Sequence, residues 1–333
     1  MQDMLAEAME RLLADICQPE TIRALEAGQP KEALWTALAD AGFADALCPE
    51  AAGGAGLSLR EAVPLIETCA RHALPLPLPL TMVVRAALAE TGAHSVAGPI
   101  TIAAAAPQAG SDGIRCARVP FGALADWIVV DTGMPALWPV HGASIERDGI
   151  YASVDADVVW PAPPGDAIPL PLADWQAIAA CVSAVQMAGA MARVLEMTIA
   201  YANDRSQFGR PIGKFQALQQ QISVLAERVF ATRMAACIGC SVQGWRVERA
   251  AAAVAKGYAS EAATLAASIA HAVHGAIGIT AEFALQNYTR RLHAWRLAYG
   301  AESYWHGELG ELWLGGKASA LDFVRSALSE AST

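Results

Sequence analysis

The chain lacks the positive charge that a polyanion-binding protein needs. Its 333 residues contain 23 lysines and arginines against 33 aspartates and glutamates, so the formal net charge is −10. Binding to a phosphate backbone requires clustered cations, and Arg290–Arg291 is only a local basic pair. The composition therefore argues against nucleic acid as a partner.

Long uninterrupted apolar runs are also missing, although 54% of the residues are hydrophobic. Charged residues such as Arg85 and Glu196, and the prolines that follow Leu74, interrupt the densest stretches, so no membrane span is expected. The first residues, MQDMLAEAMERL, are acidic and lack the basic region of a secretory signal. They predict an amphipathic helix instead.

The cysteines and histidines indicate neither a disulfide framework nor a metal site. Seven scattered cysteines, an odd number, predict reduced thiols in a cytoplasmic protein. Cys237 and Cys240 form a single CxxC, which cannot supply four zinc ligands, so we expect them to be small buried residues. His271 and His274 are three residues apart, but no third metal ligand is evident near them.

Two common phosphate-binding patterns are absent or incomplete. No GxGxxG follows a predicted strand, which leaves a dinucleotide site of that type unsupported. Gly310–Lys317 (GELWLGGK) is one residue too long for a phosphate loop, and Ala318 stands where a magnesium-binding Ser or Thr is needed.

The first half of the chain divides into a helical and a β-like segment. Residues 1–98 predict an N-terminal helical domain, in which Leu59–His72 is one helix and Leu74–Leu80 (LPLPLPL) is an extended connection. Residues 99–172 predict a small β domain. Its β-like runs are Ile100–Ala104, Trp127–Val130 and Tyr151–Val159.

The second half is helical again. Residues 173–315 predict a bundle of four long helices, and residues 316–333 a tail. In the helix after Lys214, apolar residues recur every three or four positions, which predicts one buried stripe. The stripe comprises Phe215, Leu218, Ile222, Leu225 and Val229.

The most informative segment is Asp204–Gln216 (DRSQFGRPIGKFQ), at the junction of two predicted helices. Arg205 can form two hydrogen bonds to phosphate oxygens, and Phe208 can pack its ring against a planar group. Gly209 allows a close backbone approach, and Pro211 ends the helix and fixes a turn. The residues alone indicate an anionic ligand with an aromatic ring system.

This string resembles the R-x-Q-F-G-x-P-I-x-x-F-Q signature of the acyl-CoA dehydrogenase family of flavoproteins. Leu38–Ser58 is similar to the family's P-E-x-x-G-G-x-G-L-S loop, and His271–Gly300 is similar to its H-G-G-x-G-x-T-x-E…Y-x-R-R motif. The three segments occur in family order. The resemblance implies a mainly α fold with an N-terminal helical domain, a reduced β domain and a C-terminal four-helix bundle that forms homo- or hetero-oligomers.

The resemblance also implies α,β-dehydrogenation of an acyl-CoA thioester, in which a carboxylate takes the α proton and FAD accepts the hydride. It assigns Arg205 to the flavin phosphate and Phe208 to ring packing across a subunit boundary, with Gln216 as a weaker candidate. Gly275 matches the first glycine of the family's Q-x-x-G-G element, but Ala272 occupies the glutamine position.

The middle of the chain matches the family less well. Ala105–Asp112 (AAPQAGSD) echoes the T-E-P-x-x-G-S-D loop that lines the flavin in the family. Trp127–Ile128 echoes the W-I-T segment. A plain loop and a buried strand are equally compatible with these two stretches.

Neither family position of the catalytic base holds a carboxylate. Tyr299 occupies the position directly before Gly300, and Ala179–Ala180 occupy the alternative position on the preceding helix. Two explanations stay open. Glu302 could reach inward as the base, or the chain could be one half of a hetero-oligomer whose partner carries the base. In the second case the chain could be a non-catalytic subunit that completes the partner's flavin site.

Overall fold

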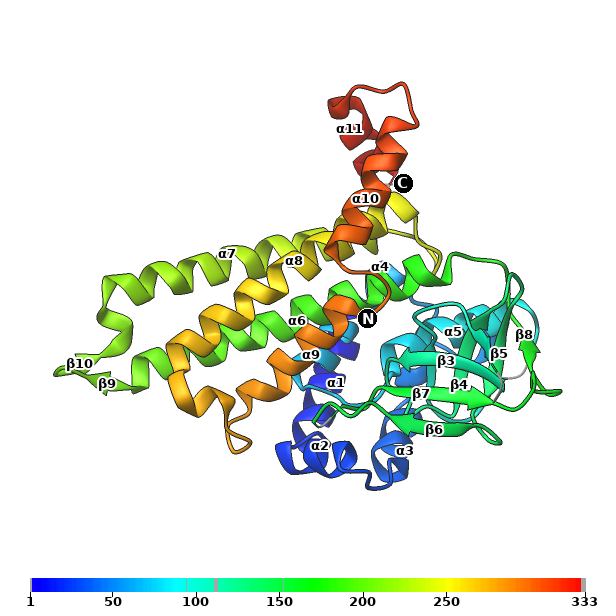
Figure 1. The fold of residues 1–333 in the computed structure, drawn as a ribbon, viewed down its shortest axis with the longest axis horizontal. Helices are drawn as coiled ribbons and strands as arrows, with labels where there is room; N and C mark the ends of the chain where they lie inside the picture. The colour runs from blue at the N-terminus through cyan, green and yellow to red at the C-terminus, as the bar shows by residue number, and fades with distance from the viewer. Residues whose placement is uncertain (1, 94, 111–112, 152, 331–333) are drawn as a thin grey trace. The chain divides into compact units, whose positions relative to one another are not determined.

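The computed structural model describes residues 2–93, 95–110, 113–151 and 153–330 (Figure 1). The chain forms two compact units. The first comprises Met1–Leu65, Leu74–Ala179 and Val242–Val247, and the second comprises Ile66–Ala73, Ala180–Ser241 and Glu248–Thr333. The predicted boundaries at residues 98 and 172 fall in connections between elements.

Helices form the first part of the first unit. They are α1 (Gln2–Ile16), α2 (Pro19–Glu26), α3 (Glu32–Asp40), the N-terminal half of α4 (Leu59–Arg71) and α5 (Leu78–Glu90). Helix α4 begins with a capping arrangement, because the Ser58 hydroxyl donates to the Glu61 carboxylate at 2.7 Å and the Glu61 N–H donates back to Ser58 Oγ.

The expectation that Leu74–Leu80 is extended is wrong for its second half. Helix α5 begins at Leu78 and contains Pro79 in its first turn. A proline is accepted there because the first N–H groups of a helix have no intrahelical acceptor, and the fixed φ of proline is already helical. The prolines before it, Pro75 and Pro77, lie in the connection from α4.

Two four-stranded sheets form the β region of the first unit. One has the order β1 (Ile100–Ile102), β4 (Trp127–Asp131), β5 (Pro135–Pro139), β8 (Ile168–Pro169), and the other β2 (Gln108–Gly110), β3 (Gly113–Val119), β7 (Ala156–Trp160), β6 (Ser144–Arg147). Only the β1–β4 pair is parallel among the described strands. The sequence runs predicted β1, β4 and β7, and strands β2, β3, β5, β6 and β8 were not predicted.

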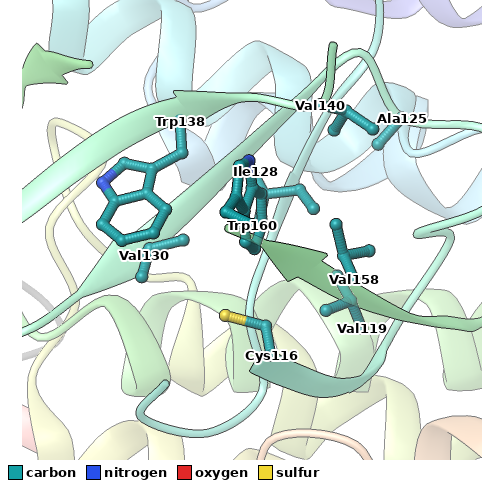
Figure 2. Packing of buried hydrophobic residues seen from close by; sticks show 9 residues of the cluster. All are labelled: Cys116, Val119, Ala125, Ile128, Val130, Trp138, Val140, Val158 and Trp160. Carbon is teal, nitrogen blue, oxygen red and sulfur yellow. The ribbon is translucent and has the colours of Figure 1, made fainter. Parts of the chain in front are cut away.

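Side chains of both sheets meet in one core (Figure 2). Trp138 of β5 and Trp160 of β7 make an edge-to-face contact with ring centroids 5.2 Å apart. The indole of Trp160 donates a 2.8 Å hydrogen bond to the Pro139 carbonyl, so the ring is buried without an unpaired donor. This pair fixes the two sheets against each other.

Polar contacts tie the helices of the first unit to its sheets. The Thr81 hydroxyl lies between α5 and β1, accepting from the Ile100 N–H at 2.8 Å. Lys31 forms an ion pair with Asp126, and its ammonium is mostly shielded from water. The helical and β segments therefore fold as one compact unit.

The second unit contains the long helices. They are α6 (Trp175–Asp204), which enters from the first unit, α7 (Gln216–Gly239), α8 (Arg249–His274), α9 (Leu285–Leu297), α10 (Glu302–Leu314) and α11 (Ala320–Glu330). The predicted stripe of α7 is buried at Leu225 and Val229 and partly buried at its other positions. The predicted tail from residue 316 includes α11.

Small residues allow these helices to approach closely. A Cβ atom on Gly189 of α6 would lie 2.4 Å from the Glu67 carbonyl of α4, and one on Gly239 of α7 would lie 2.6 Å from Cβ of Ala255 in α8. Both distances are shorter than any normal contact. Glycine is therefore required at each crossing.

Helices α6 and α8 are long and apolar enough to cross a membrane by length and composition. The most apolar part of α6 is almost entirely buried within the protein, and that of α8 is half buried. Such burial is typical of core helices.

The cysteines form no disulfide in the described chain, and all except the partly buried Cys237 are buried. Burial raises the pKa of Cys48 and Cys116 to about 12, with the nearby Asp45 carboxylate adding to the effect at Cys48.

We expect Gly189→Ala to destabilise the protein by about 2 kcal/mol, because the methyl group forces α4 and α6 apart. Gly307→Ala is the matched control, since this helical glycine has no atom within 4 Å of an added Cβ. It should stabilise the protein by about 0.5–1 kcal/mol through helix propensity. Denaturant unfolding measures both changes. Equal effects of the two substitutions would contradict the close-packing argument.

Candidate functional site

A tight hairpin joins α6 to α7. Strand β9 (Ser206–Gln207) pairs antiparallel with β10 (Arg210–Pro211), and the Ile212 N–H donates to the Arg205 carbonyl at 2.8 Å. Phe208 and Gly209 form the two-residue connection with φ angles of +53° and +78°. Positive φ at both positions is typical of a type I′ turn, which matches the twist of a hairpin.

Phe208 is unusual at the first position of this turn. A bulky L-residue with positive φ is strained, whereas Asn and Gly adopt this conformation readily. The side chain is also 91% exposed, and its only ring contact in the described chain is an edge-on approach to Phe215 at 6.2 Å. An aromatic ring held in a strained, solvent-facing position indicates a surface that contacts something beyond this chain.

The other predicted residues of this segment are equally accessible. Arg205 directly follows α6 and is exposed, and no carboxylate in the described chain forms an ion pair with it. Gln216 is the first residue of α7 and is exposed as well. The structure therefore brings Arg205, Phe208 and Gln216 together at one connection, where no described carboxylate pairs with the cation and Phe215 approaches the ring edge-on.

Gly275 lies at the same end of the bundle. Tyr201, one turn before Arg205, stacks on His274 with ring centroids 4.5 Å apart. Gly275 follows His274 with φ +64° and ψ −145°, a combination that is largely restricted to glycine. No atom lies within 4 Å of a Cβ at this position, so the backbone is open on that side.

Two histidines support the turn at Gly275. His274 is buried, and its Nδ1 is 2.8 Å from the Ala270 carbonyl. His271 Nε2 is 2.9 Å from the Thr289 hydroxyl. Burial lowers the pKa of both rings below that of free histidine, which favours the neutral form at pH 7. They pack and hydrogen-bond within the bundle, and no cluster of three possible metal ligands is present in the described chain.

These features fit a planar, anionic group such as the FAD that the resemblance implies. An exposed ring can pack on a ring system, an unpaired guanidinium can bind phosphate oxygens, and an open glycine backbone admits close approach. The stack between Tyr201 and His274 had no sequence signal, because the two residues are far apart in the chain and each occupies an ordinary helical position.

The turn that carries Tyr299 is closed by buried hydrogen bonds. Lys256 is fully buried, and its ammonium donates to Ser260 Oγ at 2.8 Å, the Gly300 carbonyl at 2.9 Å and the Arg296 carbonyl at 3.0 Å. Burial lowers the pKa of Lys256 to about 7, and the Glu302 carboxylate opposes this effect. The single ammonium thus ties α8 to the end of α9.

Tyr299 has φ +59° and is 3% exposed, and its carbonyl accepts from the Trp305 indole at 3.0 Å. A Cβ on Gly300 would lie 2.6 Å from the Tyr304 ring. Ala179 and Ala180, at the alternative base position that the resemblance implies, are both buried. The residues at the two base positions that the resemblance implies are therefore buried, and none of them carries a carboxylate.

Glu302 is held by Arg296. Arg296 Nε donates to Oε2 of the carboxylate at 2.9 Å, and a second guanidinium nitrogen contacts Oε1. The hydrogen bonds from Arg296 lower the pKa of Glu302 below its ordinary value. A carboxylate stabilised in this way is a weaker proton acceptor, so the geometry favours a structural clamp over a base.

The loop that echoes the family's middle-domain motif is only partly placed. Ser111 and Asp112 lie outside the described residues, and Gly110 ends the exposed strand β2. Trp127 lies at the start of β4, where its indole donates to the Ala97 carbonyl at 3.0 Å. The role of this loop and of Trp127 toward a cofactor stays a prediction.

Comparisons with known proteins agree on the family. The model of the acyl-CoA dehydrogenase N-terminal domain matches residues 1–96, and that of the C-terminal domain matches residues 178–306. Acyl-CoA dehydrogenase IpdE2 of Mycolicibacterium smegmatis is 31% identical over 300 residues, covering 88% of this chain and 92% of that protein.

Solved structures show the same fold. The steroid ACAD variant Tcur3481-Tcur3483 superimposes with a TM-score of 0.83 at 26% identity, covering 96% of this chain and 99% of that one. The ChsE4-ChsE5 complex from Mycobacterium tuberculosis gives a TM-score of 0.81 at 23% identity, covering 95% and 98%.

Phe208→Asn should raise the free energy of unfolding by about 0.5–1 kcal/mol, because Asn–Gly is the favoured pair for this turn. Phe208→Leu is the control, since it removes the ring but keeps a bulky residue at positive φ. Thermal or urea unfolding of both variants measures the difference. A less stable Asn variant would show that the turn is not strained.

Glu302→Gln should lower stability by about 1 kcal/mol at pH 7 through loss of the charged contact with Arg296. Because the folded-state pKa of Glu302 is depressed, its contribution is complete above the unfolded value near 4.5 and is lost as pH falls through the folded pKa. The difference in the free energy of unfolding between wild type and variant should therefore disappear as the pH is lowered. A difference that is constant from pH 7 to pH 3 would contradict the clamp.

Proposed function

Because this chain belongs to the acyl-CoA dehydrogenase family, we propose that it is one subunit of a hetero-oligomeric, FAD-dependent acyl-CoA dehydrogenase. It contributes the hairpin of Arg205 and Phe208 to a flavin site at a subunit boundary. The partner subunit contributes the catalytic carboxylate. The reaction is α,β-dehydrogenation of an acyl-CoA thioester.

The contrast between the hairpin and the two base positions that the resemblance implies carries this proposal. The hairpin presents a strained, 91% exposed Phe208 and an unpaired Arg205, which supports contact with a ligand or subunit. The two base positions hold the buried Tyr299, Ala179 and Ala180. A chain equipped for flavin but not for proton abstraction needs a partner to complete the reaction.

Similar proteins support the heteromeric form and the substrate class. One solved structure of this fold is named a steroid ACAD, and another is named as a complex of two different proteins. We therefore propose a thioester with a steroid-derived acyl group as the substrate. The seven scattered cysteines, none of which forms a disulfide in the described chain, support a cytoplasmic setting.

The residues of this chain act by binding and orientation. When bound, FAD supplies the acceptor for the hydride of the β carbon. Arg205 holds a phosphate of the nucleotide, Phe208 packs on a ring, and Gly275 lets the backbone approach the cofactor. Gln216 adds an amide at the first turn of α7. Glu302 fixes the turn before α10 through Arg296 and transfers no proton.

Tagging the chain in its own host and purifying the assembly tests the proposal. We expect a yellow complex with a second, different subunit that dehydrogenates acyl-CoA, whereas the chain alone shows no turnover. Within the complex, Glu302→Gln should leave turnover per bound flavin unchanged, and Phe208→Asn should lower the flavin content. A homo-oligomer of this chain with its own turnover would overturn the heteromeric assignment. Absence of flavin from every assembly would overturn the proposal as a whole.

A further inference from the structure

We propose that Arg210 is a second cation for the diphosphate of the bound nucleotide, held in place by the ring of Phe215. This inference rests on the proposed function, since it concerns the same flavin site. It names a binding residue that the family signature leaves open, because Arg210 stands at a variable position of that signature.

The register of the hairpin puts Arg205 and Arg210 on one face. Gln207 is opposite Arg210, and Ser206 is opposite Pro211. The hydrogen bond from the Ile212 N–H to the Arg205 carbonyl extends this pairing by one position. Side chains alternate along each strand, and directly opposite residues share a face. Arg205 is therefore the diagonal neighbour of Arg210.

Diagonal neighbours in an antiparallel pair lie about 7–8 Å apart, within reach of two long side chains. Two phosphate groups of one diphosphate could be bound by such a pair, one guanidinium to each. Neighbouring like charges repel each other unless an anion lies between them. The two cations on this face therefore favour the binding of a dianionic ligand, which removes their mutual repulsion.

Arg210 has an aromatic support and no acidic partner. Its guanidinium carbon lies 4.3 Å from the centroid of the Phe215 ring. No carboxylate of the described chain lies within ion-pair distance of Arg210 or Arg205, whereas most other arginines of the second unit, such as Arg233 and Arg296, are paired with glutamate. Stacking restricts the long side chain and leaves its N–H edge free for oxygen acceptors.

Phe215 is itself fixed by the fold. It is the residue before α7, it is partly buried, and its N–H donates to the Ile212 carbonyl at 3.1 Å. The backbone that carries the ring is therefore held at the start of α7, and the edge-on neighbour of the ring is Phe208 at 6.2 Å. One aromatic pair supports both the exposed ring and the second cation of the hairpin.

The test compares FAD affinity of the purified assembly carrying Arg210→Gln with that of the wild type, by titrating the flavin-stripped protein and following flavin fluorescence. We expect a fall of about tenfold at low salt, the size of one lost charged hydrogen bond. The difference should narrow at high salt, because a phosphate contact is screened. Lys317→Gln removes an equally exposed charge from the C-terminal segment and should leave FAD affinity unchanged.

Phe215→Leu tests the positioning role. It should lower FAD affinity about threefold when Arg210 is present and have no further effect in the Arg210→Gln background. Additive losses would show that Phe215 does not act through Arg210, and would overturn that part of the proposal.

The two proposals fail in different ways. Wild-type assembly that binds FAD with the same affinity as Arg210→Gln overturns the second-cation role and leaves the proposed function intact. A loss that does not change with salt shows that Arg210 contacts an uncharged part of the nucleotide, which also overturns it. Wild-type assembly that binds no FAD overturns the proposed function and this inference together.

Discussion

The structure of the candidate site depends on one chain reversal between two long helices. Helix α6 ends at Asp204 and α7 begins at Gln216, so only eleven residues reverse the direction of the chain. The pairing of β9 with β10 completes this reversal and forces Phe208 and Gly209 to positive φ. This pairing sets the direction in which the exposed side chains of Arg205 and Phe208 leave the backbone. A looser connection of the same composition would leave the guanidinium and the ring without a fixed orientation.

A second turn, between α9 and α10, is built on the opposite principle. Its polar groups face inward, where the Lys256 ammonium bonds to the Arg296 and Gly300 carbonyls and the Trp305 indole bonds to the Tyr299 carbonyl. Buried polar groups of this kind hold a single conformation because each donor or acceptor would be costly to leave unpaired. The exposed hairpin is suited to binding, and the buried turn between α9 and α10 is suited to structural support.

The long helices and the turn between two of them were largely predictable from sequence, whereas the pairing of β9 with β10 and the long-range contacts were not. Periodic apolar residues identified α7, and the DRSQFGRPIGKFQ string identified the turn between two helices. Strand β3 was not predicted because the adjacent exposed residues Ala117 and Arg118 break the alternation of apolar and polar residues. Lys256 would be expected on a solvent-facing side of α8, and only the carbonyls of a distant turn explain its burial. The start of α5 at Leu78 was not predicted, because proline ends most helices but is accepted in a first turn, as Pro79 is here.

The cysteines add a property that has nothing to do with the proposed reaction. With pKa values near 12, Cys48 and Cys116 carry almost no thiolate at neutral pH while the protein is folded. Both belong to the first unit, one beside its helices and one in the core between its sheets. Alkylation of either thiol therefore requires the surrounding structure to open. These two side chains can therefore report local unfolding in that unit. The rate at which each thiol is labelled measures how often the structure around it opens.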